Sequence, residues 1–191
     1  NGFVKFRLIG ALNKPIENLK KTNLKNRKAD KTIVQNNSDR AIYKSVKADV
    51  DIEYDVSGNM LKETIVLNKK SKQSFAFEII TSAKSAVKNN DNSISFYDDK
   101  GNEIYVMASP YMLDAAGEYS SEIETALTQT TTGYTLIYTP NYEWLSEKER
   151  EYPIKIDPTM FNAIVKETVA DTYVGNMQNA TYNDIRGGWD V

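Results

Sequence analysis

Hydrophobic and polar residues alternate with a period of two along much of this 191-residue chain. Residues 4–8, 51–56, 75–79 and 134–139 are examples, each with an aliphatic or aromatic side chain at every second position. Successive side chains of a β-strand point to opposite faces of the sheet, so this period is typical of strands with one buried face. The alternation predicts a β-protein before any motif is considered.

Turn-forming residues separate these runs at intervals suited to hairpins: Ser57–Asn59, Asn89–Asn92, Asp98–Asn102, Ala116-Gly117 and Thr132-Gly133. Short strands with repeated turns predict an all-β fold, specifically an antiparallel β-sandwich. One short helix is predicted near 141–150, with Asn141 as its N-cap and Pro153 beyond its end. Residues 82–88 are a second, weaker helix candidate.

We predict two parts in the chain, with the boundary at Asp157-Pro158-Thr159. Residues 1–158 form the β-sandwich, with a basic segment at 1–48. Residues 159–191 are a C-terminal extension, in which 161–166 and 171–174 have the composition of strands. About thirty residues bury too little surface to fold alone. This extension is therefore either an appendage of the first domain or the truncated start of a second β-domain.

The absence of two residue types excludes several mechanisms. The chain has neither Cys nor His, which excludes disulfides, thiolate nucleophiles, Cys-ligated zinc and the Ser-His and Cys-His catalytic pairs. From this we predict that the chain is not an enzyme and holds no metal or cofactor. No apolar run reaches the roughly 18 residues that a membrane span needs. The chain begins at Asn1 without a signal-peptide pattern, as expected of an internal fragment.

Charge is unevenly distributed along the sequence. Residues 1–50 carry twelve Lys and Arg against four Asp and Glu, a net charge of +8, and the remainder carries twelve against twenty-two, a net of -10. A basic stripe can bind nucleic acid or an anionic polymer, but it is more often a solvated surface. The Lys-rich run from Lys20 to Lys31 contains no aromatic residue for base stacking. We therefore predict no nucleic-acid partner.

Three catalytic or metal-binding patterns are better explained as ordinary structure. The Ser-x-x-Lys match at Ser85–Lys88 lacks the accompanying motifs of penicillin-recognising enzymes. The acids of the 141–150 helix region are expected to face solvent. The run Asp98–Glu103 is predicted to be a β-turn, because Lys100 stands among the would-be calcium ligands. A Lys–Asn isopeptide crosslink is left open by the composition.

Aromatic side chains supply the remaining candidates for a binding site. The chain has 12 Tyr and 2 Trp, and flat rings can stack on the faces of sugars. Most Tyr residues fall at alternating strand positions, which predicts core or cross-strand packing. The ligand-binding candidates are those near turns, Tyr111, Tyr119 and Tyr142.

Several segments in a fixed order resemble the module that precedes the DNRLRE domain in bacterial wall-associated and RHS-repeat surface proteins. They are Ala41–Val46, Val50–Val56, Gly58–Ile65, Ala108–Asp114, Tyr138–Leu145 and Tyr152–Thr159, and together they cover about residues 40 to 160. Beyond them, Asp171–Val174 with Asn179 and Tyr182 is similar to the first strand of DNRLRE domains. The DNRLRE string itself is absent.

This resemblance implies a secreted, cell-wall-associated location. We therefore predict a non-catalytic extracellular structural or spacer module of a large bacterial cell-wall-associated or RHS-like protein. The alternative is a carbohydrate-binding module for cell-wall or plant polysaccharide. The expected partners are the neighbouring domains of the same polypeptide, with cell-wall polysaccharide as a further candidate.

Overall fold

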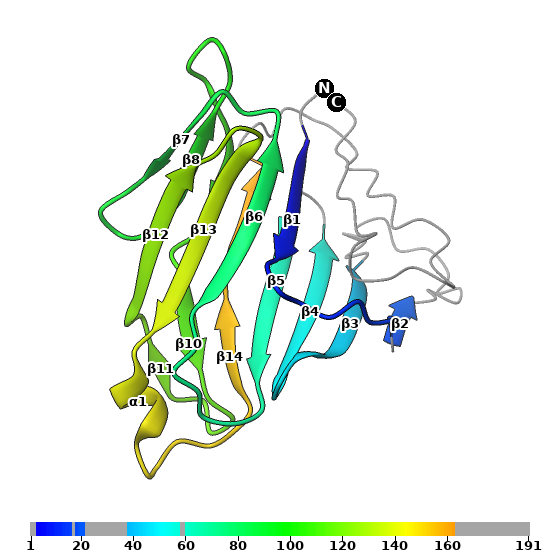
Figure 1. The fold of residues 1–191 in the computed structure, drawn as a ribbon, viewed down its shortest axis with the longest axis vertical. Coiled ribbons are helices and arrows are strands. Elements are labelled where there is room, and N and C mark those ends of the chain that lie inside the picture. Colours follow the sequence, from blue (N-terminus) through cyan, green and yellow to red (C-terminus); the bar gives the residue numbers. More distant parts are fainter. Residues whose placement is uncertain (1–2, 17, 22–37, 58–59, 163–191) are drawn as a thin grey trace, which may run out of the picture.

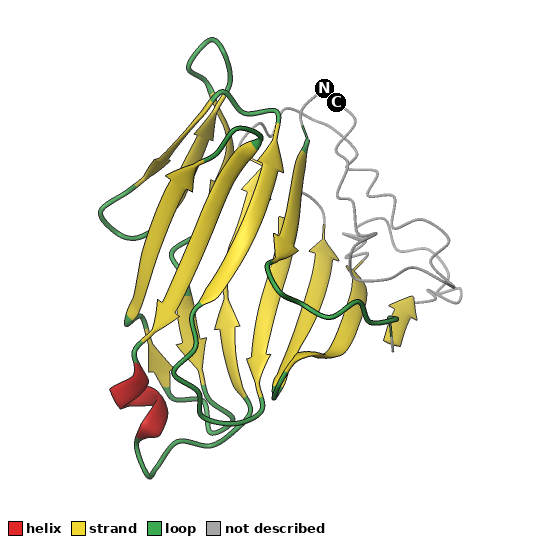
Figure 2. Cartoon of the chain, viewed as in Figure 1, coloured by secondary structure: helices red, strands yellow, loops and turns green. Residues whose placement is uncertain are grey.

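The described part of the chain folds into two packed β-sheets with one short helix at one end (Figures 1 and 2). The computed structural model describes residues 3–16, 18–21, 38–57 and 60–162. In chain order the elements are β1 (Val4–Leu8), β2 (Asn18–Lys21), β3 (Ser38–Lys47), β4 (Val50–Ser57), β5 (Met60–Leu67), β6 (Phe75–Thr81), β7 (Ser85–Lys88), β8 (Ile94–Tyr97), β9 (Glu103–Met107), β10 (Tyr111–Leu113), β11 (Tyr119–Ser120), β12 (Ile123–Gln129), β13 (Gly133–Pro140), α1 (Tyr142–Ser146), β14 (Ile154–Asp157) and β15 (Thr159–Asn162). This confirms the predicted antiparallel all-β fold.

The smaller sheet has four strands in the order β1-β6-β13-β12. All its neighbours are antiparallel, and Phe77 on β6 lies opposite Leu8 on one side and Leu136 on the other. Directly opposite residues share a face of the sheet, so these three apolar side chains project together. Their common face forms one wall of the core.

The larger sheet is built around β5, which pairs along its whole length with β4 and on its other edge with β14 and then β15. Ile156 lies opposite Ile65 and Thr159 lies opposite Lys62, so β14 and β15 follow β5 in one unbroken register across Pro158. Beyond them, β10 pairs with β14 and β9 pairs with β15. Residues 159–162 therefore belong to the same sheet as β5. The rest of the predicted C-terminal extension lies outside the described residues.

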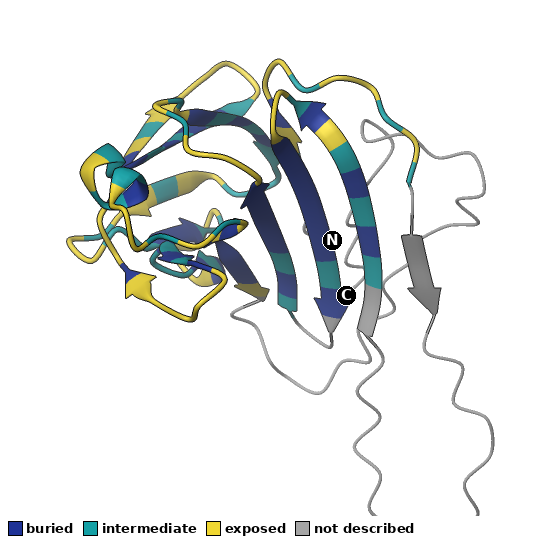
Figure 3. Cartoon of the chain, turned by 90° about the horizontal axis from the view of Figure 1, so that it is seen from below, coloured by how far each residue is buried: buried dark blue, intermediate teal, exposed yellow. Residues whose placement is uncertain are grey.

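Aromatic and aliphatic side chains from both sheets fill the space between them. The largest fully buried side chains include Tyr43, Phe75, Phe77, Phe96 and Tyr138. Edge-to-face contacts join Phe77 to Tyr138 and Phe96 to Tyr134, each with ring centroids 6.1 Å apart. Each fully buried side chain of this size stabilises the fold by about 1.5–3 kcal/mol. Burial alternates with partial exposure along β13, as the sequence period predicts, whereas β4 and β5 are buried along most of their length; Figure 3 shows both kinds of strand.

The helix α1 begins where predicted but is shorter than predicted. The side-chain oxygen of Asn141 accepts hydrogen bonds from the backbone N–H groups of Glu143 (2.8 Å) and Trp144 (3.3 Å), which confirms it as the N-cap. The helix ends at Ser146, because Glu147 has an extended ψ of 146°. The guanidinium of Arg150 instead lies 4.5 Å from the centre of the Trp144 ring and pairs with Asp114 at 3.1 Å.

The second helix candidate, residues 82–88, is wrong. Ser85–Lys88 form strand β7, which pairs antiparallel with β8. The turn between them closes through a hydrogen bond from Asn89 N–H to the Ser93 carbonyl (2.8 Å), and Asn92 has a φ of 68°. The hairpin satisfies the backbone here, and this tertiary pairing overrides a weak helical composition. In the part of the chain that the structure describes, no helix has the length and apolar character to cross a bilayer.

Candidate functional site

The strand registers bring a set of polar and aromatic side chains together on the outer face of the larger sheet. Tyr119 on β11 lies opposite Leu113 on β10, which lies opposite Lys155 on β14. In the adjacent row, Tyr111 lies opposite Asp157. Paired residues share a face, and so do residues two apart along one strand. These side chains therefore all project away from the core.

Tyr111 and Tyr119 form a stacked pair. Their ring centroids are 5.5 Å apart with an interplanar angle of 30°. Tyr119 is 61% exposed, whereas Tyr111 is only partly exposed and its hydroxyl donates a hydrogen bond to Asp157 Oδ2 (2.5 Å). The ring that faces solvent is thus supported from beneath by a ring that is anchored to the sheet.

The turn between β10 and β11 holds the two rings in place. Asp114 Oδ1 accepts a hydrogen bond from the Glu118 N–H (2.8 Å), and its Oδ2 pairs with Arg150 (3.1 Å). Gly117 has a φ of +94°, a conformation that other residues rarely adopt. The hairpin is therefore braced by buried polar contacts rather than left as a loose loop.

Asp157 is the anchor of this face, although it is only 3% exposed. It accepts hydrogen bonds from Tyr111 and from Thr159 Oγ1 (2.8 Å), and it forms an ion pair with Lys62. Burial by itself would lower the pKa of Lys62, but the hydrogen bond and attraction of Asp157 prevail and raise it. Burial, followed by the hydrogen bond to Asp157, raises the pKa of Tyr111. Both groups keep their protons at neutral pH and supply fixed contacts.

Lys155 is the less tightly held cation beside this cluster. Its ammonium lies 4.0 Å from Glu53 Oε2, and its side chain is 48% exposed. The same Glu53 oxygen is already paired with Arg40. Arg40 is therefore the closer partner of that carboxylate, and Lys155 makes the longer contact.

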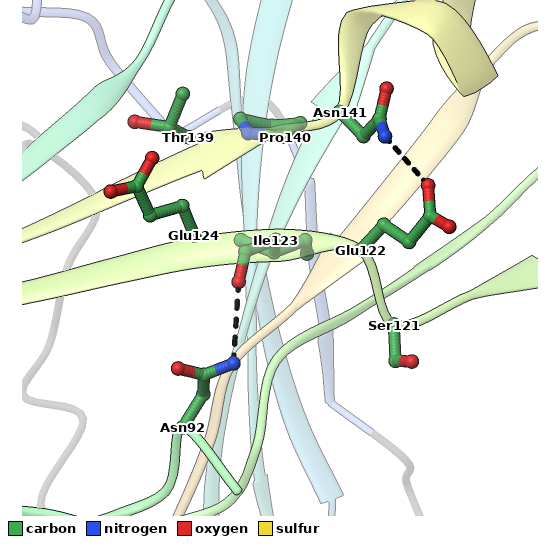
Figure 4. A pocket seen from close by; sticks show the side chains of 8 residues that line it. All are labelled: Asn92, Ser121, Glu122, Ile123, Glu124, Thr139, Pro140 and Asn141. Atoms are coloured by element: carbon green, nitrogen blue, oxygen red, sulfur yellow. Dashed lines mark hydrogen bonds between the residues drawn. The ribbon is translucent and has the colours of Figure 1, made fainter. Parts of the chain in front are cut away.

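A separate open pocket of about 450 Å³ lies at the start of β12 (Figure 4). Its lining residues are Asn92, Ser121, Glu122, Ile123, Glu124, Thr139, Pro140 and Asn141. The Asn141 side-chain N–H donates to Glu122 Oε2 (2.6 Å), so the amide that caps α1 also engages this carboxylate. Glu122 and Glu124 give the pocket an acidic lining, which disfavours anionic ligands.

One carboxyl group faces the core instead of solvent. Glu63 on β5 is buried, and its Oε1 accepts a hydrogen bond from the Tyr54 hydroxyl (2.6 Å). Burial raises the pKa of Glu63 to about 7, despite the opposing effect of that hydrogen bond. The pKa of the core residue Tyr138 is also raised, first by burial and then by the charge of Glu63. Glu63 titrates near neutrality but lies out of reach of a substrate on the outer face.

The structure brings two of the three predicted ligand-binding tyrosines together. Tyr111 and Tyr119 stack, whereas Tyr142 lies on α1, where the ammonium of Lys72 is 4.4 Å from the centre of its ring. A ligand-binding role for these tyrosines stays a prediction. Sequence reasoning missed Lys62, Lys155 and Asp157. The alternation in Ile154-Lys155-Ile156-Asp157 could have placed the last two on the polar face.

The three catalytic or metal-binding patterns that we explained as ordinary structure are structural features in the fold. Ser85 and Lys88 are three residues apart on one strand, so their side chains point to opposite faces. Asp98 accepts hydrogen bonds from the backbone N–H groups of Lys100 and Asn102, both at 2.8 Å, as in the predicted turn. The acids of the helix region are exposed, namely Glu143, Glu147, Glu149 and Glu151. Within residues 3–162, as far as they are described, no cluster of acids is arranged to hold a metal ion.

The chain is similar in sequence to part of three proteins named as tRNA nucleases. It is 30% identical over 163 residues to the tRNA nuclease WapA of Bacillus subtilis strain 168, to the tRNA3(Ser)-specific nuclease WapA of Bacillus spizizenii and to the tRNA(Glu)-specific nuclease WapA of Bacillus subtilis subsp. natto. Each match covers 81% of this chain but only 7% of the relative. No family model and no solved structure matches the chain.

These relatives contradict the functional predictions made from the sequence. The predictions of a non-catalytic structural or spacer module and of a carbohydrate-binding module are wrong, as are those of no enzymatic activity, of a polysaccharide partner and of no nucleic-acid partner. The inference failed because lacking Cys and His excludes particular mechanisms only. Lys, Arg, Glu and Tyr can also transfer protons or stabilise the charge that develops during phosphodiester cleavage.

Proposed function

We propose that this chain is a segment of a tRNA nuclease similar to WapA. The observation that carries the proposal is the 30% identity over 163 residues, which spans most of the chain and three proteins named for cleavage of tRNA. Since the chain spans 7% of the length of these relatives, the nuclease activity is assigned to the whole polypeptide. Within this chain, the outer face of the larger sheet is the surface that we assign to RNA.

The test is cleavage of tRNA by the full-length gene product. The purified protein is incubated with total tRNA, and the products are separated on a denaturing gel and identified by hybridisation to individual tRNAs. We expect discrete fragments from one tRNA or a small set of them. Intact tRNA, under conditions in which WapA of Bacillus subtilis produces fragments, would overturn the proposal.

We also propose that the polypeptide is exported and that a DNRLRE-like domain follows this segment. The support is the ordered set of motifs from Ala41 to Thr159 and the similarity of Asp171–Val174 to the first strand of that domain. An antibody raised against this chain should detect the protein in the wall and culture-medium fractions. Detection in the cytoplasmic fraction alone would contradict export.

A further inference from the structure

We propose that Tyr119, stacked on Tyr111, is a binding site for an unpaired base of RNA and that Lys155 contacts the adjoining phosphate. The site uses a flat ring and a nearby cation, the two elements by which proteins hold single-stranded nucleic acids. The choice of RNA as the ligand rests on the proposed function. The geometry of the site does not depend on it.

The ring of Tyr119 is exposed to solvent and ordered by its contact with Tyr111. Tyr119 is 61% exposed, although one side of its ring is already covered by Tyr111 with the centroids 5.5 Å apart. Tyr111 is in turn fixed by its hydrogen bond to Asp157, and Lys62 and Thr159 hold that carboxylate. Tyr119 is therefore held in position before any ligand arrives. A ring that is already ordered loses little conformational entropy when it binds.

The cation stands in the same row of the sheet as the exposed ring. Tyr119, Leu113 and Lys155 are successive cross-strand partners on β11, β10 and β14. Lys155 is thus two strand spacings from Tyr119, about 10 Å between backbones. Leu113 lies between them and adds an apolar surface. Arg40 is the closer partner of Glu53, although it also lies 3.7 Å from Asp55, so a phosphate that attracts Lys155 need displace only the 4.0 Å contact with Glu53.

The acidic pocket at the start of β12 is the poorer candidate for the same ligand. Glu122 and Glu124 line it, and a phosphate placed there would meet two carboxylates. A stacked ring beside a weakly held lysine has the opposite character, since it attracts both a base and its phosphate. The exposed, stacked ring of Tyr119 and the half-exposed Lys155 therefore favour the outer face of the larger sheet as the site for RNA.

The binding experiment uses this 191-residue chain and a fluorescently labelled, unstructured single-stranded RNA of twelve nucleotides, with anisotropy measured from 20 to 200 mM salt. We expect Tyr119→Ala to weaken binding by about ten-fold or more, whereas Tyr119→Phe retains the ring and stays within about two-fold of the original. Lys155→Gln should weaken binding and lower the slope of log affinity against log salt by about 0.7, the value for one phosphate contact on a single strand.

The matched control for the cation is Lys69→Gln. Lys69 is an exposed lysine that pairs with Asp49 at 3.1 Å, away from the stacked rings. We expect this variant to leave both the affinity and the salt slope unchanged. Thermal unfolding followed by circular dichroism checks that each variant is folded. If Tyr119→Ala is folded and binds RNA as the original does, the site is disproved.

Two further outcomes separate this inference from the proposed function. If the full-length protein cleaves tRNA but this chain binds no RNA even at 20 mM salt, the site is wrong and the proposed function stands. If the chain binds RNA through Tyr119 but the full-length protein leaves tRNA intact, the site stands and the nuclease proposal fails. Displacement of the RNA by a neutral oligosaccharide, with no dependence on salt, would overturn the assignment to RNA.

Discussion

Two carboxyl groups on opposite faces of the larger sheet each accept a hydrogen bond from a tyrosine hydroxyl, yet they have different electrostatic surroundings. Glu63 faces the core with Tyr54 as its donor, and burial raises its pKa to about 7. Asp157 faces outward with Tyr111 as its donor, and it forms an ion pair with Lys62. Among the described ion pairs, Lys62 is the partner of Asp157, and none involves Glu63.

The comparison shows what a nearby cation adds to a buried acid. A hydrogen bond from a neutral hydroxyl offsets only part of the cost of burying a carboxylate, so Glu63 holds its proton up to neutral pH. A lysine supplies the opposite charge as well, and its long side chain covers the carboxylate while its ammonium still reaches solvent. The inner face of the sheet therefore buries a neutral acid, whereas on the outer face the buried acid is held in an ion pair.

The largest expected contrast comes from truncating one aromatic ring in the core between the sheets and one on the outer face of the larger sheet. Phe77→Ala removes a fully buried ring between the sheets and should lower the free energy of unfolding by about 3–5 kcal/mol. Tyr119→Ala removes an exposed ring and should change the free energy of unfolding by less than about 1 kcal/mol. Urea unfolding followed by circular dichroism measures both. Equal losses would contradict the burial of Phe77 in the core and the exposure of Tyr119 on the outer face.

Glu63 should make stability depend on pH in the direction opposite to a salt-bridged acid. Its pKa is about 7 in the folded chain and 4.5 when unperturbed, so the folded state binds the additional proton between these values. Stability is therefore lost as the pH rises from about 4.5 through 7, by on the order of 3 kcal/mol. Glu63→Gln should remove this loss.

The measurement for Glu63 is urea unfolding of both proteins at pH 5 and pH 8. The free energy of unfolding of Glu63→Gln minus that of the original protein should be larger at pH 8 than at pH 5. The pairwise difference cancels the effect of other groups, such as Asp51, whose pKa is lowered through hydrogen bonds from Lys44 and Ser45 that outweigh its burial. An unchanged difference would show that Glu63 is not buried as an acid.

On the outer face, removing the charge of Asp157 should have a smaller effect. Asp157→Asn leaves Lys62 without its counter-ion and should cost about 1–2 kcal/mol, because the lysine side chain is 34% exposed and solvent compensates in part. The double variant with Lys62→Gln should recover part of that loss in the same urea experiment. Strictly additive effects of the two changes would mean that the ion pair contributes no coupling.

The sequence determined the fold class through local rules. The period of two specified strands such as β1, β4, β6 and β13, and Asn141 specified where the helix begins, because side-chain alternation and capping depend only on neighbouring residues. The same alternation placed five of the 12 tyrosines in the core, namely Tyr43, Tyr54, Tyr105, Tyr134 and Tyr138. Where local preferences were weak, as at Ser85–Lys88, hairpin pairing decided the structure.

Only the tertiary structure decided which side chains meet. Tyr111 and Asp157 are 46 residues apart, and Lys62 is more distant still from Asp157, so their cluster depends on the register of β5, β10 and β14. The tertiary structure also decided whether the first domain ends at Asp157-Pro158. Local composition indicated a boundary there, but β14 and β15 continue along β5 in one register. Pairing between distant strands is set by the packing of the whole sheet, which no single segment encodes.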